Sequence, residues 1–252
     1  MFRTFAEGLA AGRALTFGHR GARAYAPMNT IPSFELALEM GAHGIEFDVR
    51  RSKDGVLVLL HDPGVDETSN GHGNVADLTF AELRELDFGS WFNPKYAGTQ
   101  IPTLDELFET VGKQFLMNVE IKCEHLASEG IEQQVADTIA RHGLADRILI
   151  SSFNPFVVKR SAMVMPHILR GLLVEEATPF DRIRLLRSLE IRALHPYFPY
   201  IDADYMQKAR ALGLAVNTWT VNDPAEAQRL AELGVSTVIT DMPDVILAAL
   251  GT

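Results

Sequence analysis

Residues 44–62 read GIEFDVRRSKDGVLVLLHD, and this stretch gives the first indication of the fold. In the run 44–49, Glu46 and Asp48 alternate with apolar residues. Successive side chains of a strand point to opposite faces. A buried strand here therefore presents both carboxylates on one face and its apolar side chains on the other. A second apolar run follows at 56–60.

Short apolar runs alternate with helical patterns along the rest of the chain. Strands are expected at 14–18, 44–49, 56–60, 115–121, 147–151, 168–173, 191–194, 214–219 and 236–240. Helices are expected at 30–40, 103–112, 128–142, 155–164, 178–189, 202–212, 223–233 and 243–250. Such alternation predicts parallel strands joined by helical crossovers. About eight units in a chain of this length predict an α/β fold of the (β/α)8 TIM barrel type. A doubly wound sheet is the alternative, but no GxGxxG follows the first strand.

Residues 62–102 interrupt this alternation. They contain loop-rich stretches such as ETSNGHGN and SWFNPKYAGTQIP. We interpret the segment as a small insertion after the second strand region, ahead of the next barrel helix. Since no interdomain linker is visible, residues 1–252 are expected to form one barrel domain.

The composition and the net charge limit the range of possible binding partners and compartments. The formal charge of −10 disfavours nucleic-acid binding and would repel an anionic substrate unless cations lie at the site. The single cysteine, Cys123, excludes an intramolecular disulfide and fits a reducing compartment. No signal peptide and no run of about 18 apolar residues is found. We therefore expect a cytoplasmic protein without stable membrane insertion.

Two strands place polar residues on what would be the inner face of a barrel. The apolar face of each strand packs on helices, so Glu46 and Asp48 face the lumen. In the stretch MNVEIK, Asn118, Glu120 and Lys122 share one face. Three converging carboxylates would raise one another's pKa values and destabilise the fold. A hard divalent cation, Mg²⁺ or Ca²⁺, relieves this repulsion. The alternative is a set of ion pairs, for example Lys122 with Glu46.

Histidine and arginine side chains follow two of the apolar runs. His19 and Arg20 leave the first strand together, beside flanking glycines, and His61 ends the run 56–60. Arginine presents a planar fork that suits phosphate oxygens, and histidine titrates near neutral pH. This combination indicates acid–base chemistry on a phosphate ester. His195 ends another strand run and either reaches the same pocket or is structural.

The order of these motifs resembles the glycerophosphodiester phosphodiesterases. The resemblance runs over the chain from residue 14 onward. It is carried by HRG at 19–21, NT at 29–30, EFDVRRSKDG at 46–55, HD at 61–62, ETSNGHGNVADLTFAELRELDFGSWF at 67–92, IPTLDEL at 101–107, EIK at 120–122, SSFNP at 151–155, NTWTVND at 217–223 and ITDMPD at 239–244. It implies a (β/α)8 barrel with a small insertion after the HD motif.

The resemblance also implies roles for the polar residues. Glu46, Asp48 and Glu120 would hold the divalent cation. His19 and His61 would be the general acid and base, in an order that stays open. The reaction would convert a glycerophosphodiester to sn-glycerol 3-phosphate and an alcohol, with water or the glycerol 2-hydroxyl as the attacking group.

The remaining implied roles concern substrate binding. Arg20 and Lys122 would grip the phosphate, and Trp219 would form a wall facing the glycerol, unless it is a core residue. Phe153 would line the pocket on similar grounds. One departure is Met28, which stands where the family usually has a glutamate before Asn-Thr. A thioether cannot ligate a hard cation, so we infer that this position is dispensable for metal binding or that affinity is altered.

Two alternatives to this function remain open. One is a lysophospholipase D-type activity on lipid phosphodiesters, which would need an apolar entrance; Trp91, Phe92 and Tyr96 of the insertion are candidates, although such residues more often pack an insertion onto its barrel. The other is a catalytically degenerate ligand-binding barrel, favoured only by Met28. No charged cage for a choline or ethanolamine head is visible, so rates should vary modestly among glycerophosphodiesters.

Overall fold

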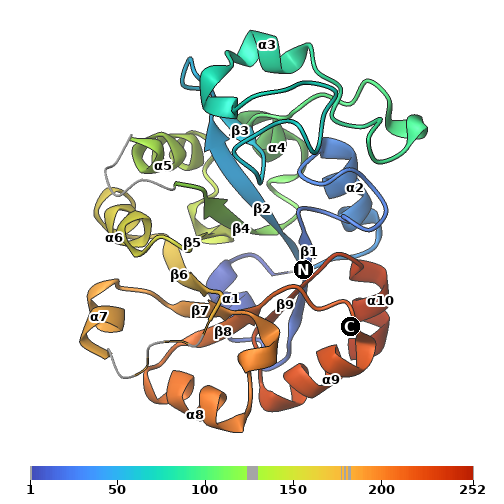
Figure 1. Cartoon of the computed structure of the whole chain (residues 1–252). Helices are drawn as coiled ribbons and strands as arrows, with labels where there is room; N and C mark the ends of the chain where they lie inside the picture. Colours follow the sequence, from blue (N-terminus) through green and yellow to red (C-terminus); the bar gives the residue numbers. More distant parts are fainter. Residues whose placement is uncertain (1, 124–129, 177, 179, 181–182, 252) are drawn as a thin grey trace.

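The computed structural model describes residues 2–123, 130–176, 178, 180 and 183–251 (Figure 1). Within this part of the chain, eight parallel strands form a closed barrel surrounded by helices. The barrel strands are β1 (Leu15–His19), β2 (Gly44–Arg51), β4 (Leu116–Ile121), β5 (Ile148–Ser152), β6 (Leu169–Val174), β7 (Ala193–Pro196), β8 (Ala215–Thr218) and β9 (Thr237–Thr240). β1 pairs with both β2 and β9, which closes the ring. The predicted TIM barrel is confirmed.

The outer ring consists of one helix after nearly every strand. Its members are α2 (Ile31–Glu39), α4 (Leu104–Val111), α5 (Ile131–His142), α6 (Pro155–Val164), α7 (Ile183–Ser188), α8 (Ala203–Ala211), α9 (Pro224–Leu233) and α10 (Pro243–Leu250). Two expected helices, 128–142 and 178–189, have parts outside the described residues, namely 128–129, 179 and 181–182.

Local sequence fixes where several helices begin and end. The side chain of Asn154 accepts from the backbone N–H of Phe156 ahead of α6, and proline follows at the first helical position. Asp223 caps α9 in the same way. At its other end α9 stops at Gly234, whose φ of 88° is a left-handed conformation open to glycine at little cost.

The run 56–60 forms a strand, β3 (Leu57–Leu59), but this strand does not belong to the barrel. It pairs antiparallel with β2, with Leu57 opposite Arg51 and Leu59 opposite Val49. The hairpin carries the chain back toward the barrel, and the Leu60 N–H donates to the Asp48 carbonyl. Hence His61 does not end a parallel strand as expected. It reaches the site on the returning arm of a hairpin.

The segment 62–102 lies at the β3 end of the molecule, as Figure 1 shows, and contains α3 (Phe80–Arg84) and the 3₁₀ turns Val75–Asp77 and Pro94–Tyr96. The predicted insertion is therefore present. Its residues Val65, Val75, Leu83, Phe88 and Ile101 form an apolar cluster with Val58 and Leu60 of the β3 arm.

The aromatic residues of the insertion pack within it and onto the barrel. Phe92 contacts Trp91 and Tyr96 edge to face. The Tyr96 hydroxyl donates to the Tyr25 carbonyl in the loop after β1. Phe92 and Tyr96 thus have structural contacts, as expected of residues that anchor an insertion.

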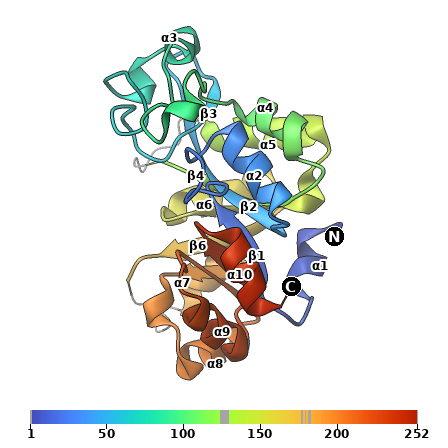
Figure 2. The same cartoon turned by 90° about the vertical axis from the view of Figure 1, so that its right-hand side faces the viewer.

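The two ends of the barrel differ in character. α1 (Phe5–Leu9) lies at the end of the barrel where the strands begin (Figure 2). There Phe5 packs with Leu15, Phe17 and Leu116 in an apolar lumen cluster. At the carboxyl ends, the inward positions are polar. The apolar end is closed, so a ligand must approach from the polar end, where barrel enzymes have their active sites.

Candidate active site

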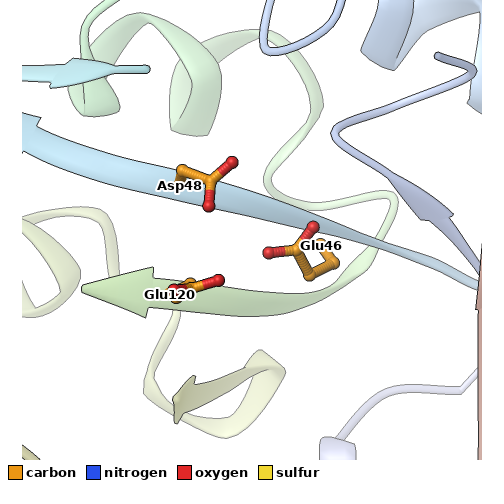
Figure 3. Close-up of side chains that lie close together, drawn as sticks. All are labelled: Glu46, Asp48 and Glu120. Atoms are coloured by element: carbon orange, nitrogen blue, oxygen red, sulfur yellow. The ribbon is translucent and has the colours of Figure 1, made fainter. Parts of the chain in front are cut away.

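Glu46, Asp48 and Glu120 converge at the polar end of the lumen (Figure 3). β2 and β4 pair in parallel with Glu46 opposite Asn118 and Asp48 opposite Glu120, so the three carboxylates share the inner face. One oxygen from each lies within 4.8 Å of the others, and all three side chains are buried. The convergence predicted from strand alternation is present.

Cations compensate part of this charge. Lys122 Nζ lies 3.1 Å from Asp48 Oδ1 and 2.6 Å from Glu120 Oε1, and Arg20 Nε lies 3.1 Å from Asp48 Oδ2. Asn29 Nδ2 also donates to Asp48 Oδ2 (2.9 Å), which gives Asn29 a contact within the site. Burial alone would raise the pKa of Asp48, but Lys122 and Arg20 outweigh it and hold that pKa well below its ordinary value.

The other two carboxylates are less well compensated. Burial, followed by the charges of Asp48 and Glu120, raises the pKa of Glu46 well above its ordinary value. Burial and Asp48 raise the pKa of Glu120 to about 7. Glu46 Oε2 has no hydrogen-bond partner among the described residues. Lys122 pairs with Asp48 and Glu120, and the proposed pair with Glu46 is not formed. An all-oxygen set with one orphaned carboxylate oxygen fits a hard divalent cation.

His19 is oriented by the carboxylate of Asp241, which directly follows the last strand, β9. Its Nδ1 lies 2.7 Å from Asp241 Oδ1, so the ring donates Nδ1–H and directs Nε2 toward Glu46, whose Oε2 is 3.9 Å away. Asn222 in turn donates to Asp241 Oδ2 (2.9 Å). Burial lowers the pKa of His19 to about 4, and Asp241 partly offsets this effect.

His61 is held in a similar way. Its Nδ1 lies 2.8 Å from Asp62 Oδ1, and Arg50 Nε donates to its carbonyl (2.9 Å). Burial lowers the pKa of the His61 ring, with an opposing contribution from Asp48. Each of the two histidines therefore has a carboxylate at Nδ1, which leaves Nε2 as the nitrogen available for proton transfer.

Arg20 occupies an uncommon backbone conformation. Its φ is 54°, in the left-handed region, beside Gly21 at 88°. Its Nη1 donates to the Met28 sulfur (3.2 Å). Met28 thus contacts Arg20, but a thioether is only a weak acceptor, so Asp48 remains the charged partner of this arginine.

These side chains surround one cavity of about 420 Å³. Every predicted site residue lines it except Asp48, which is fully buried behind the others. The lining is His19, Arg20, Arg23, Glu46, His61, Asn118, Glu120, Lys122, Phe153, Leu173, Glu175, Trp219, Thr220 and Ile239. Arg23, Glu175 and Thr220 were not predicted, nor was Asp241, although the motif ITDMPD contains it.

Aromatic residues form one wall of the cavity. Phe153 and Trp219 meet edge to face with ring centroids 5.6 Å apart, and Lys122 Nζ lies 5.9 Å from the Phe153 centroid. Trp219 Nε1 donates to the His195 carbonyl (2.9 Å), which fixes the indole. His195 itself is fully buried against Asn217 and does not line the cavity, so its role is structural.

The fold and the site together define a barrel enzyme with buried carboxylates and histidines at the carboxyl ends of its strands. The glycerophosphoryl diester phosphodiesterase family matches residues 19–245. The chain belongs to this family and is a hydrolase of phosphoric diesters. The resemblance noted in the sequence is thereby confirmed.

Individual relatives cover nearly the whole chain. A glycerophosphodiester phosphodiesterase of Caldanaerobacter subterraneus subsp. tengcongensis is 38% identical over 236 residues, 93% of this chain and 97% of that protein. One of Bacillus subtilis is 32% identical over 94% of this chain and 86% of its own length. A phosphodiesterase of Oleispira antarctica, solved in complex with the product sn-glycerol-3-phosphate, has a TM-score of 0.87 at 30% identity and covers 97% of this chain and 99% of that one.

None of the helices in the described part of the chain is long and apolar enough to cross a membrane.

Proposed function

We propose that this protein hydrolyses glycerophosphodiesters to sn-glycerol 3-phosphate and an alcohol in a reaction that depends on a divalent cation. The observation that carries the proposal is the buried cluster of Glu46, Asp48 and Glu120, which opens on the same cavity as two histidines, Arg20 and Lys122. The product bound to the Oleispira antarctica phosphodiesterase supports the substrate class.

The three carboxylates would hold Mg²⁺ or Ca²⁺. A cation held there would supply positive charge that polarises the phosphoryl oxygens and offsets the charge that develops during hydrolysis. Arg20 and Lys122 add two cationic donors on the same cavity, and both are anchored by Asp48. Their positions are therefore set before the substrate arrives, which lowers the cost of ordering them around a phosphate.

His19 and His61 would move the protons. One accepts the proton of the attacking oxygen, and the other protonates the alkoxide that leaves. The carboxylates of Asp241 and Asp62 hold both rings with Nδ1–H as the donor. Phe153 and Trp219 would contact the substrate from the aromatic wall of the cavity. Together these roles complete a general acid–base site.

Residues 1–252 would form one domain that acts on a small-molecule substrate. A reducing compartment such as the cytoplasm is consistent with a single cysteine, Cys123, which has no second cysteine to pair with in the chain.

Turnover of glycerophosphocholine by the purified chain tests the proposal. sn-Glycerol 3-phosphate, measured with a coupled dehydrogenase, should accumulate with Mg²⁺ or Ca²⁺ and stop when EDTA is added. A matched sample of Glu46→Gln should be inactive under all conditions. Undiminished turnover in EDTA would contradict the metal site, and absence of turnover with either cation would contradict the proposed reaction.

A further inference from the structure

The residues that directly follow four consecutive barrel strands are regularly spaced in the sequence. The residues directly after β5, β6, β7 and β8 are Phe153, Glu175, Tyr197 and Trp219, which recur at intervals of 22 residues. These strands are neighbours in the sheet. We call the four residues the rim cluster, because they stand above the polar end of the lumen.

The aromatic members of the rim cluster contact one another. Tyr197 and Trp219 have ring centroids 5.4 Å apart and also share a parallel backbone bridge. Trp219 also meets Phe153 edge to face. Phe153 and Tyr197 remain 41% and 38% exposed, so their rings are partly open to a ligand. Phe153 and Trp219 line the cavity, and Tyr197 extends this aromatic wall through its contact with Trp219.

Glu175 places a carboxylate beside this wall. Val174 pairs with Pro196, and the Tyr197 N–H donates to the Val174 carbonyl, so Glu175 follows directly at the level of Tyr197. Glu175 lines the same cavity as Phe153 and Trp219. It is exposed, and no hydrogen bond or ion pair joins it to the described residues.

This charge is unexpected at the entrance to a phosphate site. The substrate is an anion and the chain already carries a formal charge of −10, so a further carboxylate at the mouth repels the phosphodiester. The repulsion is reversed if the substrate brings a cation to that position. Aromatic faces next to a carboxylate are the usual surroundings of a bound ammonium group.

We propose that the rim cluster binds the cationic head group of the substrate, so that the preferred substrates are glycerophosphodiesters of ammonium alcohols. The inference rests on the proposed function and adds to it the class of leaving alcohol. It departs from the sequence-based expectation of similar rates for all head groups. It also places Trp219 beside the head group, where the resemblance implied a glycerol contact.

The test compares two substrates that differ in the charge of the alcohol. Glycerophosphocholine carries a trimethylammonium head, and glycerophosphoglycerol carries a neutral one. For Glu175→Gln, kcat/KM for glycerophosphocholine should fall on the order of tenfold, mainly through KM, and for glycerophosphoglycerol should stay within about twofold. Glu175→Lys should extend the loss for the cationic substrate.

Glu176→Gln is the matched control. Glu176 is the neighbouring exposed carboxylate and does not line the cavity, so the variant removes the same charge without touching the rim cluster. Both substrates should be turned over normally by this variant. If kcat/KM of Glu175→Gln fell equally for both substrates, or if this variant behaved like Glu176→Gln, the head-group assignment would be overturned. The proposed function would not be affected by that result. If the wild-type protein turned over neither substrate, the proposed function would fall and this inference with it.

Discussion

Replacing Glu120 by glutamine should raise the stability of the metal-free protein, relative to the wild type, as the pH rises through neutrality. Burial and Asp48 raise the pKa of Glu120 to about 7, whereas an unperturbed glutamate has a pKa of 4.5. Between these values the folded state keeps a proton that the unfolded state has released. The contribution of Glu120 to stability is therefore complete below about pH 4.5 and is lost as the pH rises to about 7.

The size of the effect follows from the shift. At about 1.4 kcal/mol for each pKa unit, the contribution of Glu120 amounts to about 3 kcal/mol. Most of it, about 2–3 kcal/mol, should be lost between about pH 5 and about pH 8. Glutamine does not titrate, so the variant should not show this loss. The free energy of unfolding of the variant minus that of the wild type should therefore be about 2–3 kcal/mol larger at about pH 8 than at about pH 5.

Urea denaturation in EDTA, followed by tryptophan fluorescence, measures both proteins at the two pH values. Only their difference is diagnostic, since burial lowers the pKa of His19 to about 4 and this ring destabilises both proteins as the medium becomes acidic. Glu109→Gln, which removes an exposed carboxylate from α4, controls for the loss of one charge. A difference that stays constant with pH would refute the reasoning, because Glu120 would then ionise alike in both states.

Asp48→Asn should weaken Mg²⁺ or Ca²⁺ binding in calorimetry by at least about tenfold and abolish turnover; unchanged affinity would remove Asp48 from the ligand set. His61→Ala should lower kcat by on the order of a hundredfold or more while metal affinity changes little. A diester with an acidic alcohol should rescue this variant if His61 is the acid, and parallel loss of metal would show it to be a ligand. Asp241→Asn should lower kcat by about tenfold with little change in KM, because it releases the ring of His19. A loss confined to KM would indicate a substrate contact instead.

The inner faces of β2 and β4 could be predicted because strand alternation is a local property. Glu46, Asp48 and Glu120 needed only the two-residue period and the assumption of a barrel. The direction of β3 could not be predicted in this way. An apolar run of five residues reads alike in a parallel and an antiparallel strand, and only its pairing with β2 decides between them.

Side-chain contacts that form only when the barrel closes could not be predicted from the sequence either. Asp241 orients His19 although 222 positions separate them, because β9 pairs with β1 when the ring closes. Glu175 and Tyr197 each follow a strand of ordinary composition. The only signal was their regular recurrence with Phe153 and Trp219, and that regularity becomes visible once the strand ends are known.

The hairpin of β2 and β3 makes the site a composite of two structural units. Glu46, Asp48 and Glu120 belong to the barrel wall, whereas His61 stands where β3 leads into a segment that forms an apolar cluster with the β3 arm. A change inside that cluster, at Leu83 or Ile101, can displace a proton donor or acceptor while every carboxylate keeps its place. Exchange of the 62–102 segment between related barrels should therefore change the rate of proton transfer. The affinity for the cation should stay that of the barrel that receives the segment.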